Sequence, residues 1–168
     1  MSNMEVKDKE LNEKLFQIGR EASQEIQELR NKHEKDIECS LRKCLDEAAE
    51  KGVHFDTDDM EKIIACNERL KAAKCLALER AIDNICSLTR DKVEEVRHIH
   101  TMNTWLCKND GRAYKFVYLG QPCYRTYKGE IWLAVMEGQL GEWLGTWNPQ
   151  TNILEEGEEP MHPKMSRY

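Results

Sequence analysis

The sequence predicts an α+β protein, in which a long antiparallel two-helix hairpin, coiled-coil-like, precedes a small antiparallel β meander or barrel. Apolar residues recur every three or four positions through the first hundred residues, and then alternate with a period of two. Proline is absent before residue 101, whereas proline and glycine punctuate the chain after it. We therefore expect a helical hairpin over residues 1–101, a β domain over residues 102–156 and a flexible tail over residues 157–168.

The first predicted helix covers residues 7–51, a segment rich in the helix formers Glu, Lys, Leu, Gln and Ala. Its apolar row advances in steps of three or four, and part of the row repeats every eleven residues. An eleven-residue repeat favours a straight or faintly right-handed pairing of helices. The predicted row is Leu15, Ile18, Ala22, Ile26, Leu29, His33, Ile37, Leu41, Cys44 and Ala48.

The second predicted helix covers residues 57–100 and follows the short turn KGVHFDTDD. Gly52 is suited to end the first helix, and Asp56 or Thr57 to cap the second. A short loop makes the two helices antiparallel neighbours. The second helix is apolar around more than half of its circumference, so it needs neighbours on more than one side. We expect a second copy or another subunit to cover an assembly face of Ile63, Leu70, Leu78, Ile85 and Leu88; packing within a simple scaffold is the plainer interpretation.

The β domain is predicted from regularly spaced turn residues. Asn109-Asp110-Gly111 is a strong hairpin signal, and it predicts strands on both sides within TWLCKNDGRAYKFVYLG. Further breaks follow at 120–122, 128–129, 137–141 and 148–151, which makes five or six short strands. The tail, EEGEEPMHPKMSRY, is polar and is expected to be flexible or to dock as an extended arm.

Three of the four tryptophans lie between residues 129 and 147. Strict alternation along the strands would gather these indoles on one side, with Gly145 leaving a gap beside them for a ring or another backbone. Large aromatic side chains are the natural core of so small a domain, but they also anchor interfaces. We expect a core with a partly open edge, and the predicted partner-binding residues are Trp132, Trp143, Trp147, Tyr124 and Tyr127.

Basic residues alternate with aromatic ones between residues 108 and 128, a pattern suited to single-stranded nucleic acid or to an acidic peptide. A solvated strand face is the plainer interpretation. The net charge of −6 opposes a strong, non-specific grip on phosphates, so nucleic acid is a less favoured partner. The candidate face comprises Lys108, Arg112, Lys115, Arg125 and Lys128.

The seven cysteines, odd in number, suggest reduced thiols in the cytoplasm or nucleus. No apolar run is long enough for a membrane span, and the first residues carry no signal core. His98 and His100 could join Cys107 or Cys123 as zinc ligands or as a thiol nucleophile with its base, but the chain lacks CxxC and HExxH spacings. We therefore predict no catalytic residue, metal or cofactor. The expected function is non-enzymatic protein–protein interaction and assembly; a nucleic-acid-associated protein and a zinc-dependent or thiol enzyme stay as alternatives.

Overall fold

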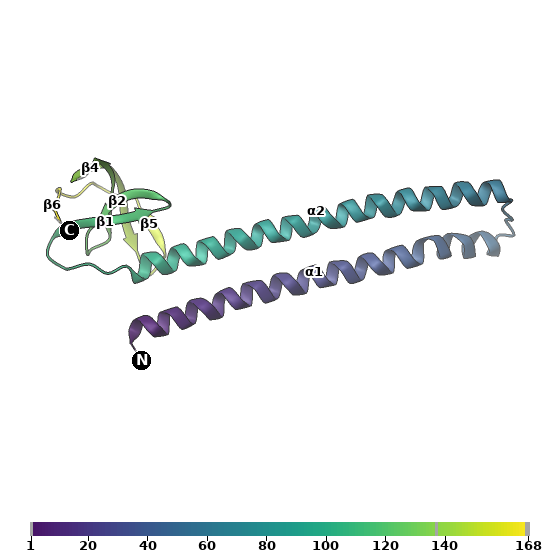
Figure 1. Ribbon diagram of the computed structural model, residues 1–168, viewed down its shortest axis with the longest axis horizontal. Coiled ribbons are helices and arrows are strands. Elements are labelled where there is room, and N and C mark those ends of the chain that lie inside the picture. The colour runs from purple at the N-terminus through teal and green to yellow at the C-terminus, as the bar shows by residue number, and fades with distance from the viewer. Residues whose placement is uncertain (1, 137, 167–168) are drawn as a thin grey trace. The chain divides into compact units, whose positions relative to one another are not determined.

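The computed structural model describes residues 2–136 and 138–166 and confirms the predicted α+β class. Two long helices, α1 (Asn3–Glu50) and α2 (Thr57–Thr104), precede a six-stranded sheet (Figure 1). The chain divides into two compact units. The helical unit comprises residues 12–94, and the sheet unit comprises residues 95–168 together with residues 1–11. The strands are β1 (Arg112–Tyr118), β2 (Gln121–Arg125), β3 (Glu130–Met136), β4 (Gln139–Asn148), β5 (Ile153–Glu155) and β6 (Lys164–Met165).

Helix α1 begins four residues before the predicted start because Ser2 and Glu5 cap it reciprocally. The Ser2 hydroxyl accepts the backbone N–H of Glu5 at 3.2 Å, and the Glu5 carboxylate accepts the backbone N–H of Ser2 at 2.8 Å. This capping box satisfies donors that a helix start otherwise leaves without partners. The sequence S-x-x-E carried this signal, although the apolar row begins only later.

The apolar row of α1 is half-buried as predicted, with one exception. Cys44 is exposed, and Leu45 occupies its place in the row. At 3.6 residues per turn, Leu45 lies about 40° around the helix from Leu41, whereas Cys44 lies about 60° away on the other side. Leucine also buries more apolar area than cysteine, so the row follows Leu45.

The turn between the helices is built as the sequence indicates. Gly52 adopts a φ of +71°, and its N–H donates to the carbonyl of Ala49 at 3.0 Å, which ends α1. The Asp56 carboxylate accepts the N–H of Asp59 at 2.8 Å and caps α2. Of the two predicted caps, Asp56 is therefore the one used.

Helix α2 continues to Thr104, so the strand predicted before Asn109-Asp110-Gly111 is wrong. The hydroxyls of Thr101 and Thr104 donate to the carbonyls four residues earlier, at 3.0 and 2.7 Å. These bonds occupy the threonine hydroxyls inside a helix, and the apolar Met102 of the same turn is buried in the core of the sheet unit. Asp110 instead makes a turn onto β1 by accepting the N–H of Arg112 at 3.0 Å.

The sheet has the order β5-β4-β3-β2-β1-β6. Strands β1 to β5 pair antiparallel with their neighbours, which confirms the predicted order of consecutive strands. The expectation of an entirely antiparallel sheet is wrong, because β6 pairs parallel with β1. This strand lies in the predicted tail, and it pairs with Arg112 and Ala113 at the start of the outer edge of β1. Within the described residues, Lys164 and Met165 of the predicted tail are thus part of the sheet.

The core of the sheet unit forms where one face of the sheet meets the end of α2. Its buried side chains are large and mostly aromatic or aliphatic, as a small domain requires. Ile99 and Trp105 from α2 and its exit pack around them. The buried cluster consists of Met102, Phe116, Cys123, Ile131 and Trp147.

Candidate functional site: an aromatic cleft and an apolar groove

Trp132 and Trp143 lie side by side on the sheet, and the surface that their two rings make is here called the aromatic cleft. They are register partners on β3 and β4, and their ring centroids lie 4.9 Å apart with an interplanar angle of 56°. Trp132 is fully buried, whereas Trp143 is half-buried. The two indoles therefore offer one covered and one accessible ring at the same place on the sheet.

Trp147 does not join this cleft, so the expectation of three indoles on one side is wrong. The pairing of β3 with β4 shifts between Ile131 and Trp132, since Ile131 pairs with Gly145 and Trp132 pairs with Trp143. Such a bulge breaks strict alternation. Trp147 packs into the core beside Ile131, and its indole N–H donates to the Asn103 side chain at 2.8 Å.

Gly145 is required where β5 crosses close to β4. Its φ is +136°, and a Cβ placed there would lie 2.5 Å from the carbonyl oxygen of Glu155. The gap expected beside the tryptophans is thus occupied by the backbone of β5. Of the two expected occupants, a ring or a backbone, the backbone is the one observed.

The aromatic cleft is covered by the C-terminal arm, defined here as residues 156–163. The Trp143 indole N–H donates to the carbonyl of Gly157 at 2.9 Å, and the Trp132 indole N–H donates to Oε1 of Glu159 at 3.0 Å. Nε2 of His162 lies 2.7 Å from the same carboxylate oxygen, and its ring packs edge-on to Trp132 with centroids 6.2 Å apart. The hydrogen bond with His162 and, next, that with Trp132 hold the pKa of the Glu159 carboxyl below its ordinary value.

The sequence did not single out the arm residues that fill the cleft. Gly157, Glu159 and His162 have no period or motif of their own. The only local signal is the pair of prolines around Met161 and His162, which favours extended chain. Their role depends on tryptophans 14 and 27 residues earlier in the chain.

The two predicted tyrosines have different surroundings. Tyr124 is buried, and its hydroxyl accepts the backbone N–H of Gly138 at 2.9 Å. Tyr127 is 59 % exposed and lines a cavity of about 350 Å³ that also reaches Lys128, Pro160 and Met161. Of the five predicted partner-binding residues, Trp132, Trp147 and Tyr124 are therefore covered, while Tyr127 and part of Trp143 are accessible.

The five basic residues proposed for nucleic acid are not brought onto one face. Lys108, Arg112, Lys115 and Lys128 are exposed, but Arg125 is buried. In the register of β1 and β2, Lys115 is opposite Tyr124 and Arg125 is opposite Tyr114, so Lys115 and Arg125 fall at alternate positions. A nucleic-acid strand could not reach all five at once.

Arg125 instead belongs to the interior of the sheet unit. Its guanidinium carbon lies 4.9 Å from the centre of the Trp105 ring and 5.2 Å from that of Phe116, and Nη1 lies 3.9 Å from the sulfur of Met102. Its buried Nε has no hydrogen-bond partner in the structure. Burial lowers the pKa of this guanidinium from its ordinary value, while the aromatic rings offer the cation a favourable π surface.

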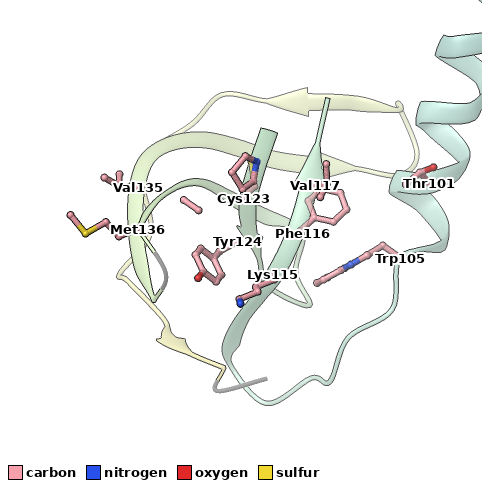
Figure 2. Close-up of a pocket in the computed structure, with 11 residues that line it drawn as sticks. Thr101, Trp105, Lys115, Phe116, Val117, Cys123, Tyr124, Val135 and Met136 are labelled. Atoms are coloured by element: carbon pink, nitrogen blue, oxygen red, sulfur yellow. The ribbon is translucent and has the colours of Figure 1, made fainter. Parts of the chain in front are cut away.

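An apolar groove of about 640 Å³ lies beside this cluster (Figure 2). Three of its apolar side chains are largely exposed: Val117 at 64 %, Val135 at 67 % and Met136 at 66 %. Figure 2 shows that its labelled residues come from the end of α2 and its exit, β1, β2 and β3. Sequence reasoning missed this groove, although β3 was recognised as apolar on both faces. The other lining residues are Thr101, Trp105, Lys115, Phe116, Pro122, Cys123, Tyr124 and Ala134.

The histidines and cysteines considered for zinc or thiol chemistry are engaged separately. His98 packs edge-on to Tyr118 and Trp147, and burial lowers its pKa. Nε2 of His100 lies 3.0 Å from Asp8. Burial raises the pKa of the thiols of Cys107 and Cys123, which favours the protonated form. Among the residues whose side chains the structure describes (2–37, 41–136 and 138–166), no three His, Cys, Asp or Glu side chains are grouped to hold a metal.

The predicted assembly residues divide into two groups on α2. Ile85 is 8 % exposed, while Ile63 and Leu78 are half-buried and line cavities shared with α1 side chains such as Leu41 and Leu29. Leu70 and Leu88 are 47 % and 53 % exposed. The helical unit thus covers the first group and leaves the second largely open.

Comparison with protein-family models, with curated proteins and with solved structures finds no match. Within the described part of the chain, neither long helix has a stretch apolar enough to cross a bilayer.

Proposed function

We propose that this chain is a non-enzymatic assembly protein. Its helices pair as an antiparallel hairpin that associates with a second copy, and its sheet recognises another protein. The observation that carries this proposal is the exposed apolar surface of α2, which two helices leave uncovered. Soluble proteins ordinarily bury such a surface against a partner.

Contacts between α1 and α2 support the antiparallel direction. Asp8 meets His100 at 3.0 Å, and His33 Nε2 lies 3.5 Å from the Cys75 sulfur. Leu41 shares a cavity with Ile63. As the residue number rises along α1, that of its neighbour falls along α2, which is the order of a hairpin.

Two apolar flanks border the row of α2 that meets α1, and their members are exposed apart from Ile82, which is half-buried. At 3.6 residues per turn, Cys66, Leu70, Ala77 and Leu88 fall on one flank, while Ile64, Cys75, Ile82 and Cys86 fall on the other. Ile64, like Leu70, is 47 % exposed. On the first flank, Ala77 lies midway along the surface and allows a close approach, and Cys66, Ala77 and Leu88 repeat every eleven residues. A second copy that presents the same flank could form a four-helix bundle.

The sheet supplies the recognition surface in this proposal. The apolar groove combines exposed Val117, Val135 and Met136 with the exposed cation Lys115, a combination that suits an apolar segment carrying an acidic residue. The bulged pairing of β3 with β4 increases local twist and supports a sheet curled towards a small barrel. The six described cysteines are free thiols, which supports work in the reducing cytoplasm or nucleus.

Sedimentation equilibrium of the full chain tests the assembly. We expect a dimer at micromolar concentration, and we expect the double variant Leu70→Glu/Leu88→Glu to sediment as a monomer with its helical circular dichroism retained. Leu76→Glu is the matched control, because Leu76 is 54 % exposed but faces away from both flanks. A wild-type chain that stays monomeric at all concentrations would refute self-association.

A further inference from the structure

The arm contacts the aromatic cleft in the way that a bound peptide would, although it belongs to the same chain. The indole N–H groups of Trp132 and Trp143 both donate to it, one to the Glu159 carboxylate and the other to the Gly157 carbonyl. A buried indole N–H needs an acceptor, and a carboxylate acceptor makes the stronger, charge-assisted bond. The cleft therefore offers two donors at a fixed separation, matched by acceptors two residues apart on an extended chain.

The arm is held firmly at few points. The side chains of Glu159 and His162 are 44 % and 59 % exposed, and Met161 is 92 % exposed. A cavity of about 350 Å³ separates Pro160 to Pro163 from Tyr127, Lys128 and Glu130 of the sheet. Beyond the cavity, β6 joins β1, and the N–H of Ser166 donates to the carbonyl of Ala113 at 2.8 Å. The cavity thus lies between the contacts of the arm with the two indoles and the pairing of β6.

We propose that the cleft of Trp132 and Trp143 is a binding site for an extended acidic peptide of another protein, with the order Gly-x-Glu-Pro, and that the arm is its resident competitor. The carbonyl of the glycine accepts from Trp143, the glutamate accepts from Trp132, and the proline keeps the peptide extended. Tyr127 and Lys128 border the cavity through which such a peptide continues. This proposal rests on the recognition role of the sheet, but not on the self-association of the helices.

Tethering explains how a weak contact keeps the cleft filled. A short linker gives the arm an effective concentration on the order of millimolar, so a free peptide competes poorly until the arm is weakened. Glu159→Arg removes the acceptor for Trp132 and introduces a cation in its place. Glu158→Arg is the matched control, since it makes the same change of charge at the adjacent, exposed position.

The test uses the full chain and a synthetic peptide of residues 155–163, EEGEEPMHP. The four tryptophans each give one indole N–H signal in a proton–nitrogen correlation spectrum. In the Glu159→Arg chain, we expect the peptide to shift the signals of Trp132 and Trp143 but not those of Trp105 and Trp147. It should bind the Glu159→Arg chain about tenfold more tightly than it binds the wild type or Glu158→Arg, because the tethered competitor is weakened. A scrambled peptide should shift none of the four.

Three results would overturn the proposal. One is a folded Glu159→Arg chain whose Trp132 and Trp143 signals do not respond to the peptide. Another is an equal response to the scrambled peptide. The third is a dimer that dissociates with Glu159→Arg but not with Leu70→Glu/Leu88→Glu, which would mean that arms exchange between copies. If Glu159→Arg does not fold, the wild type decides, because a few millimolar of the peptide with a nitroxide spin label at its amino end should displace the arm and broaden the same two signals. Broadening of all four signals, or of none, would overturn the proposal.

Discussion

The guanidinium carbon of Arg125 lies 4.9 Å from the centre of the Trp105 ring. Arg125 is buried inside the sheet unit, whereas most arginines in proteins are exposed to solvent. Trp105 follows α2 and Arg125 ends β2, so the pair links the exit of the helix to the sheet. Burying a cation whose Nε has no hydrogen-bond partner among the described residues lowers the stability of the fold. The rings of Trp105 and Phe116 offset only part of that loss.

Arg125→Met should therefore either raise the free energy of unfolding of the sheet unit or lower it by no more than about 1 kcal/mol. The reason is that methionine keeps the apolar packing without a buried charge. Urea unfolding followed by tryptophan fluorescence measures it, since all four tryptophans lie in this unit. Arg112→Met, at an exposed position of β1, is the control. A loss of more than about 3 kcal/mol would mean that the buried charge is paired in solution.

Two glycines should respond in opposite directions to the same substitution. Gly145→Ala should lower the stability of the sheet unit by about 1–3 kcal/mol, because its φ is +136° and the new Cβ would meet the Glu155 carbonyl. Gly19→Ala should raise helix stability by about 0.5–1 kcal/mol, because Gly19 lies within α1 with nothing near its Cβ position. Tryptophan fluorescence measures the first change and far-ultraviolet circular dichroism the second. Equal effects would contradict the strained geometry at Gly145.

The contact between Glu159 and the cleft should be lost in acid. The folded-state pKa of this carboxyl lies below its ordinary value of 4.5, so its contribution to stability is complete above that pH and disappears as the pH falls through the folded pKa. Unfolding of the sheet unit between pH 7 and pH 3, compared with Glu159→Gln, isolates this effect from other carboxylates. The wild type should lose more stability than the variant over the acid range; superimposable profiles would contradict the contact.

The helical unit should depend on Ile85 much more than on Leu76. Ile85 is 8 % exposed, and Ile85→Ala should lower the stability of the helices by about 2 kcal/mol through lost burial and a new cavity. Leu76 is 54 % exposed, and Leu76→Ala should stay within about 0.5 kcal/mol of the wild type. Urea unfolding followed at the helical circular dichroism band compares them. A larger loss at Leu76 would place a partner on that side of α2.

The sequence alone determined the features that depend on neighbouring residues. The apolar row of α1, the break at Gly52, the cap at Asp56 and the change from helix to strands all follow from local propensity and period, because residues three or four apart on a helix share a face wherever the helix lies. The boundary at Thr104 was missed because Met102 gains burial against strands that come later in the chain.

Only the tertiary structure decided the contents of the cleft, the groove and the core of the sheet unit. The bulge between Ile131 and Trp132 puts Trp147 and Trp143 on different faces of the sheet. No local sequence pattern predicts this shift in register, because it depends on the pairing of β4 with β3. The sequence pattern predicted that Arg125 is a surface cation, but Trp105, Phe116 and Met102 surround it in the fold. Trp132 was a candidate for both core and contact, and the acceptor for its indole N–H proved to be Glu159, 27 residues later. Contacts between distant segments depend on how the chain closes in space, and the sequence does not encode that closure in any short window.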